Sequence, residues 1–72
     1  MSEILAPMVG KILAINVQVG ETFSVDDEII ILEAMKMEIP ITATESGTVK
    51  EIFCTLNSTV QQNDKLLSFE KQ

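Results

Sequence analysis

Histidine is absent from this chain of 72 residues, as are arginine, tryptophan and tyrosine, and there is a single cysteine. Without histidine, the chain can form neither Ser-His nor Cys-His nucleophile pairs, nor histidine metal sites. One cysteine cannot close an internal disulfide, which is typical of a reducing compartment and predicts a cytoplasmic protein. We therefore expect no catalytic residue in this chain, which would not be an enzyme by itself.

Positive charge is also scarce. Eleven acidic residues against five lysines give a net charge of -6, which argues against nucleic acid or an anionic membrane surface as a partner. No run of about 18 apolar residues occurs, so we expect no membrane insertion. Residues 1–7 lack the basic and apolar segments of a secretory signal. The acidic cluster at residues 26–28 lacks the spaced ligands of a calcium loop, so no metal site is predicted.

An internal repeat organises the chain. A shift of 37 positions (47 minus 10) places Gly10 on Gly47 without a gap. The same shift pairs apolar residues with apolar residues at Ile12 and Val49, Ile15 and Ile52, Val17 and Cys54, Val19 and Leu56, Phe23 and Val60, Ile29 and Leu66, Ile30 and Leu67, and Leu32 and Phe69. Neither copy alone could bury such a face, so the two copies are expected to pack together in one domain, residues 1–72. Because Cys54 matches Val17, we interpret it as a buried apolar residue rather than a reactive thiol.

Each copy consists of short β-rich segments separated by turns. We expect strands at residues 10–17, 29–34, 37–42, 48–55 and 66–70, in about eight antiparallel strands that form two facing sheets. Ile12 and Val49 both interrupt the alternation of their segments, which indicates a β-bulge in each copy. Pro40 lacks an N–H group, which places its strand at a sheet edge or at a break in the ladder. The predicted fold class is all-β.

The joint between the two copies has an unusual composition. Met35 and Met37 flank Lys36 where one strand must turn back into the next. Exposed methionines do not improve solubility and are better explained by a partner protein that binds them. The position matching Lys36 would be 73, so a two-fold relation between the copies predicts that Lys36 and the chain ends lie at opposite ends of the domain.

The segment Glu33-Ala34-Met35-Lys36-Met37-Glu38 resembles the biotin acceptor motif of biotin carboxyl carrier domains. The likeness extends from residues 6–10 to residues 66–70. The resemblance implies the flattened barrel-sandwich of biotinyl and lipoyl carriers, with two four-stranded antiparallel sheets. It implies that a biotin protein ligase joins biotin to Lys36 as an amide, and that Glu33, Ala34, Met35, Met37 and Glu38 are read by this ligase. The implied partners are biotin carboxylase and a carboxyltransferase or decarboxylase, between which the biotin carries a carboxylate.

Two alternatives remain on the same fold. One is a lipoyl-type swinging-arm carrier, with lipoate in place of biotin; acceptor lysines of that type typically follow Asp, so Met35 discriminates. The other is an unmodified binding module. The chain departs from the family pattern at three positions where glycine is usual, Asp26, Asn57 and Asn63, and at Val9, where many members have proline. Asn and Asp tolerate the left-handed conformation at some cost, so these changes are compatible with the fold.

Overall fold

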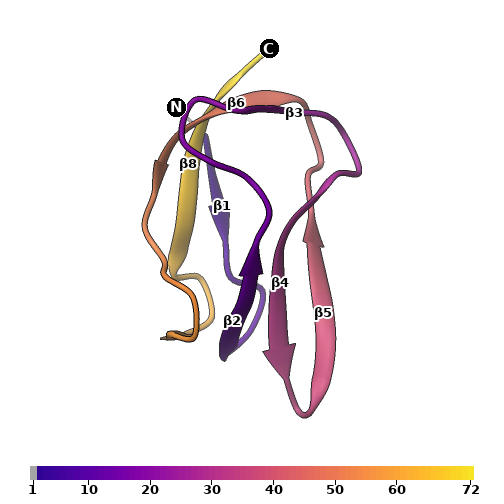
Figure 1. Cartoon of the computed structure of the whole chain (residues 1–72), viewed down its shortest axis with the longest axis vertical. Coiled ribbons are helices and arrows are strands. Elements are labelled where there is room, and N and C mark those ends of the chain that lie inside the picture. Colours follow the sequence, from indigo (N-terminus) through magenta and orange to yellow (C-terminus); the bar gives the residue numbers. More distant parts are fainter. Residues whose placement is uncertain (1) are drawn as a thin grey trace.

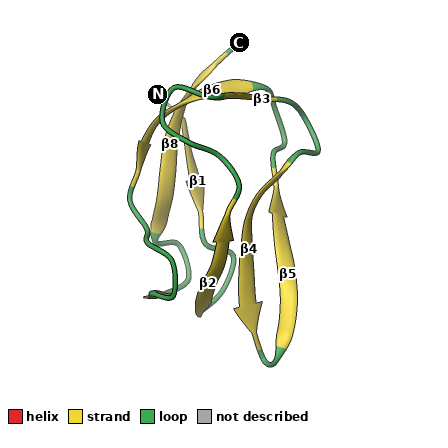
Figure 2. Ribbon diagram, in the orientation of Figure 1, coloured by secondary structure: helices red, strands yellow, loops and turns green. Residues whose placement is uncertain are grey.

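The computed structural model describes residues 2–72, which form two four-stranded antiparallel sheets (Figures 1 and 2). The first sheet has the strand order β1 (Ser2–Leu5), β8 (Lys65–Lys71), β6 (Gly47–Ile52) and β3 (Thr22–Phe23). The second sheet has the strand order β5 (Met37–Thr42), β4 (Glu28–Ala34), β2 (Gly10–Ile15) and β7 (Thr59–Val60). The expected all-β architecture is confirmed. Residues 2–72 contain no helix of a length and hydrophobicity suited to a membrane crossing.

The internal repeat corresponds to a duplicated structure. Strands β2, β3 and β4 become β6, β7 and β8 when 37 is added to their residue numbers, and β1 falls within β5. Each sheet draws two strands from each copy, because β1 and β3 lie in the first sheet while β2 and β4 lie in the second. The copies are therefore interleaved, and neither sheet could form from one copy alone.

The core lies between the sheets and is built from the matched apolar pairs. Its largest fully buried side chains are Ile12, Ile29, Ile30, Leu32, Leu66, Leu67 and Val49. Each of them is matched by another buried apolar residue in the other copy, as Ile12 is by Val49 and Leu32 by Phe69. Cys54 is buried at 7% exposure, as is its counterpart Val17, in agreement with its interpretation as an apolar core residue.

Irregular features also recur in both copies. The register of β2 on β4 shifts after Ile12, and that of β6 on β8 shifts after Val49, which confirms the two predicted bulges. The strands that contain them are shorter than predicted and end at Ile15 and Ile52. The chain then crosses to the opposite sheet, where the Gly20 N–H donates to the Val49 carbonyl and the Asn57 N–H donates to that of Ile12, each at 2.8 Å.

The turns use residues that tolerate positive φ. Gly20 has φ 90°, and the three residues that stand where the family usually has glycine adopt the same region: Asp26 (72°), Asn57 (67°) and Asn63 (70°). Two matching turns are each closed by an aspartate. Asp27 Oδ2 accepts a hydrogen bond from the Ser24 N–H at 2.9 Å, and Asp64 Oδ2 accepts one from the Gln61 N–H at 2.8 Å.

The molecule is elongated, with extents of 34 × 20 × 17 Å. The turn between β4 and β5 lies at one end of the long axis, while β1 begins and β8 leads to the C-terminus at the other (Figure 1). We call these two ends the tip and the far end. This arrangement confirms the prediction that the joint between the copies lies opposite the chain ends. Pro40 lies in β5, which is an edge strand as predicted.

Candidate functional site

The tip is a two-residue β-hairpin turn. Strands β4 and β5 pair antiparallel up to Ala34 and Met37, so that only Met35 and Lys36 connect them. Both residues have positive φ, 54° for Met35 and 64° for Lys36. Positive φ at both central residues is characteristic of a type I′ turn, whose twist matches that of the flanking strands.

The residues in this turn are unusual for its geometry. Type I′ turns favour Asn-Gly, because side chains with a Cβ are strained in the left-handed region. A residue held in such a sparsely populated region costs on the order of 1–3 kcal/mol and persists only where its surroundings fix it. Here the ladder between β4 and β5 fixes the turn, and Met35 and Lys36 occupy it despite the strain.

Most of the predicted site residues are displayed to solvent. The exposed fraction is 90% for Met35 and 65% for Met37, and Lys36 is also exposed. Glu33 and Glu38 are exposed and face one another across the hairpin as register partners. Ala34 differs, because its side chain is buried at 6% exposure and supports the turn from beneath. The tip therefore exposes the Lys36 amine between the thioether side chains of Met35 and Met37. The carboxylates of Glu33 and Glu38 lie on the strands that lead into and out of the turn.

The charges at the tip are not neutralised by ion pairs. Among residues 2–72, lysine pairs with glutamate at Lys50–Glu70 (3.1 Å), Lys65–Glu3 (3.2 Å) and Lys71–Glu45 (3.6 Å). All three involve the first sheet or the loop that leads into it, and none involves Lys36, Glu33 or Glu38. Lys11 is the register partner of Glu33 on β2, but their charged groups form no ion pair. Within residues 2–72, the Lys36 amine and the carboxylates beside it are thus exposed and form no ion pair.

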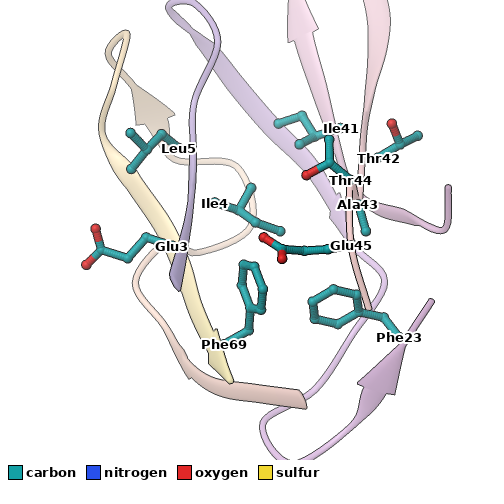
Figure 3. A pocket seen from close by; sticks show the side chains of 10 residues that line it. All are labelled: Glu3, Ile4, Leu5, Phe23, Ile41, Thr42, Ala43, Thr44, Glu45 and Phe69. Atoms are coloured by element: carbon teal, nitrogen blue, oxygen red, sulfur yellow. The ribbon is translucent and has the colours of Figure 1, made fainter. Parts of the chain in front are cut away.

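A pocket lies apart from the tip. It has a volume of about 210 Å³ and opens between the edge strands β1 and β5, toward the far end (Figure 3). Phe23 and Phe69 lie at its base, with ring centroids 5.2 Å apart, and the carboxylate of Glu45 lies above them. No predicted site residue lines this pocket. The tip itself is convex, so it suits covalent attachment rather than enclosure of a free ligand.

Other side chains that could bear chemistry are inert or dispersed. Burial raises the pKa of the Cys54 thiol above its ordinary value, which keeps it protonated and unreactive at neutral pH. In the described residues 2–72, no three Asp, Glu or Cys side chains gather in a way that could hold a metal ion. Within residues 2–72, the turn with Lys36 displays an amine between two exposed methionines.

The sequence pattern predicted which residues form the tip but not their backbone geometry. Methionine and lysine have no preference for positive φ, so the segment carried no signal for a type I′ turn. The one available clue was the length of the gap between the two apolar segments, which left room for only a short connection.

Comparisons with known proteins agree with this geometry. Residues 2–69 match the family model described as "Biotin-requiring enzyme". The chain is 46% identical over 63 residues to a biotin carboxyl carrier protein of Streptococcus mutans, covering 88% of this chain and 48% of that protein. It is 42% identical over 60 residues to a biotin/lipoyl attachment protein of Bacillus subtilis, covering 83% and 82%.

Larger proteins contain a similar segment. The chain is 38% identical over 69 residues to the human mitochondrial propionyl-CoA carboxylase alpha chain, covering 96% of this chain and 10% of that one. A solved structure of a single-chain, multi-domain long-chain acyl-CoA carboxylase superposes with a TM-score of 0.94 at 22% identity, covering 99% of this chain and 7% of that chain, and supports the fold. The chain thus spans less than half the length of the Streptococcus protein and a small part of the carboxylases.

Proposed function

The chain belongs to the biotin/lipoyl family of biotin-requiring enzymes, and from this premise we propose that it is a biotin carrier in which biotin is attached to Lys36. The observation that supports this proposal most directly is the strained, exposed turn that holds Lys36 between Met35 and Met37. We further propose that residues 1–72 form one attachment domain, and that the single buried cysteine reflects a reducing, cytoplasmic setting.

Attachment would proceed by acyl transfer from an activated biotin. The neutral Lys36 amine attacks the carboxyl carbon of biotin held by the ligase as a mixed anhydride with adenylate. The new C–N bond forms as the bond between the acyl carbon and the phosphate oxygen breaks, adenylate leaves, and the amine nitrogen loses its proton to solvent. Adenylation of biotin, with ATP as the co-reactant, belongs to the ligase. The chain contributes only an amine in a fixed, accessible place.

The carrier role follows from the mechanics of the fold. An amide-linked biotin on Lys36 is a long, rotatable arm, and the tip lets this arm swing clear of the body. The body has a packed core and hydrogen-bonded turns, so it should present the same rigid shape to every partner. Biotin carboxylase would load a carboxylate on the biotin, and a carboxyltransferase or decarboxylase would remove it. The chain is then a non-catalytic component of a larger biotin-dependent enzyme, and its likeness to a propionyl-CoA carboxylase alpha chain supports this proposal.

The test uses the purified full chain, a biotin protein ligase, ATP and either biotin or lipoate, with a lipoate ligase for the second. Intact mass spectrometry should show one biotinyl increment and no lipoyl increment. The biotinylated chain should then acquire label from radioactive bicarbonate when biotin carboxylase and ATP are added. A lipoyl increment alone would favour the lipoyl-type carrier, and no increment in either reaction would favour an unmodified binding module.

A further inference from the structure

The duplicated fold provides an internal reference for part of the surface around Lys36, because Met8, Val9 and Met35, unlike Lys36 and Met37, have counterparts at the far end. Three exposed positions at the tip end carry Met8, Val9 and Met35. Their counterparts, found by adding 37, are Glu45, Ser46 and Gln72, which are all polar. The loop that precedes β2 at the tip end recurs before β6 at the far end, so the fold itself does not require apolar side chains at Met8 and Val9.

These apolar side chains continue the surface of the turn. Lys11 on β2 is the register partner of Glu33 on β4, and the two strands run antiparallel. Extended two residues beyond its last pair, this register would bring Val9 level with Met35. A Cβ on Gly10, the residue after Val9, would lie 2.6 Å from the Glu33 carbonyl oxygen, so the chain runs close beside β4 at this point. The loop that contains Met8 and Val9 lies at the same end of the molecule as the β4–β5 turn (Figure 1).

Exposure and charge complete the description of this surface. Val9 is 53% exposed and Met8 36% exposed, although both could be replaced by polar residues as they are at the far end. Glu33 and Glu38 border the surface without ion pairs among residues 2–72, whereas Glu70, the counterpart of Glu33, pairs with Lys50 at 3.1 Å. Like charges directly opposite in a ladder are destabilising, so the facing pair of carboxylates is better explained by a partner than by the fold.

We propose that Met8 and Val9 extend the tip into a ligase-docking surface, formed with Met35 and Met37, that is apolar at its centre and bordered by the free carboxylates of Glu33 and Glu38. The partner is the biotin protein ligase, with an apolar contact region flanked by basic groups. This inference rests on the proposed function. The ligase must bring its activated acyl group to bonding distance of the Lys36 amine, so its surface covers the strands beside the turn. A carboxylase instead reaches the biotin at the end of a long arm and has less need to touch the body.

The test introduces the residues of the far end at the tip. The single variants Met8→Glu and Val9→Ser and their double variant are compared with Val19→Ser, which changes a valine of 63% exposure in the loop that crosses to the far end. We expect kcat/KM for biotin transfer by the ligase to fall about tenfold in the double variant, mainly through KM, because contacts at the centre of an interface dominate binding. Val19→Ser should stay within about twofold of the original chain. Thermal midpoints establish that each variant is folded, and Val9→Ser alone provides the test if Met8→Glu unfolds the protein.

Carboxylation by biotin carboxylase tests whether the surface is specific to the ligase. Each variant is biotinylated to completion with excess ligase, and its carboxylation by biotin carboxylase is measured. Rates within about twofold of the original chain support a surface specific to the ligase, whereas a parallel loss in both reactions contradicts it. Unchanged ligase kinetics in the double variant would overturn the docking surface while leaving Lys36 as the attachment site. Failure of the proposed function is distinct, because the original chain would then receive no biotin.

Discussion

The two ends of this molecule are built from the same repeated strands, but a turn joins β4 to β5 at the tip where the far end has the chain ends, and the side chains that they display differ. At the far end, the counterparts of Met8, Val9 and Met35 are polar, and Glu70 and Glu45 form ion pairs with Lys50 and Lys71. At the tip, methionines are exposed, non-glycine residues occupy strained turn positions, and Glu33 and Glu38 form no ion pair within the described part of the chain. Since stability requires only the features common to both ends, the differences indicate which features serve recognition.

Each copy begins its second strand with a glycine, and replacing either glycine should produce the largest change in the free energy of unfolding. A Cβ at Gly10 would lie 2.6 Å from the Glu33 carbonyl oxygen, and one at Gly47 would lie 2.8 Å from that of Glu70. Because both contacts are with backbone, Gly10→Ala and Gly47→Ala should each destabilise the fold by about 2–3 kcal/mol, measured by urea unfolding. Only Gly10→Ala should also slow the ligase when both variants are folded, since it displaces the strand that leads to the tip. Equal ligase rates would show that the position of Glu33 does not matter.

The strained turn should yield the next largest effect, in the opposite direction. Replacing Met35-Lys36 by Asn-Gly supplies the residues that a type I′ turn favours, so the double variant should be more stable by about 1–2 kcal/mol. It should also lose biotinylation entirely. The matched control is Asn57→Gly, in a turn with φ 67° that already has a tolerant residue, and its gain should be only a few tenths of a kcal/mol. An equal gain at both turns would mean that the tip carries no special strain.

The Met35→Asp variant should weaken recognition by the ligase without changing the stability of the fold. The side chain is 90% exposed, so the thermal midpoint should stay nearly unchanged, while kcat/KM for the ligase falls about tenfold. Differential scanning calorimetry and initial labelling rates provide the two measurements. A large drop in the midpoint would show instead that Met35 is part of the packed structure.

The smallest expected effect is on the pH dependence of stability, and it arises in the core, where one copy has Cys54 and the other has Val17. Burial raises the pKa of the Cys54 thiol, so the folded state holds this proton more tightly than the unfolded state does. The associated stability is complete below the unfolded pKa of about 8.5 and is lost as pH rises through the folded pKa. The Cys54→Val variant should therefore lose less stability between pH 8 and pH 10.5 than the original chain does. Parallel pH profiles for the two proteins would contradict this account.

Much of the fold could be predicted from the sequence because duplication makes every core position visible twice. Local rules predicted the bulges at Ile12 and Val49, which occupy equivalent positions in the two copies. They also predicted that Pro40 lies on an edge strand. The interleaving of the two copies could not be predicted, because it depends on long-range pairing between residues that carry no mutual signal. The type I′ turn was not predicted either, since its residues contradict the propensity of the turn they form. Such a conflict between local preference and structure is expected at a functional site.

The central claim is that the fold presents one particular amine for modification, and intact mass spectrometry of lysine variants tests it most directly. The original chain, Lys36→Arg and Lys11→Arg are each incubated with biotin protein ligase, ATP and biotin. Lys11 is an exposed lysine on β2, the strand next to β4, and provides the matched control. We predict one biotinyl increment on the original chain and on Lys11→Arg, and none on Lys36→Arg. An increment that persists in Lys36→Arg, or that disappears in Lys11→Arg, would contradict the account.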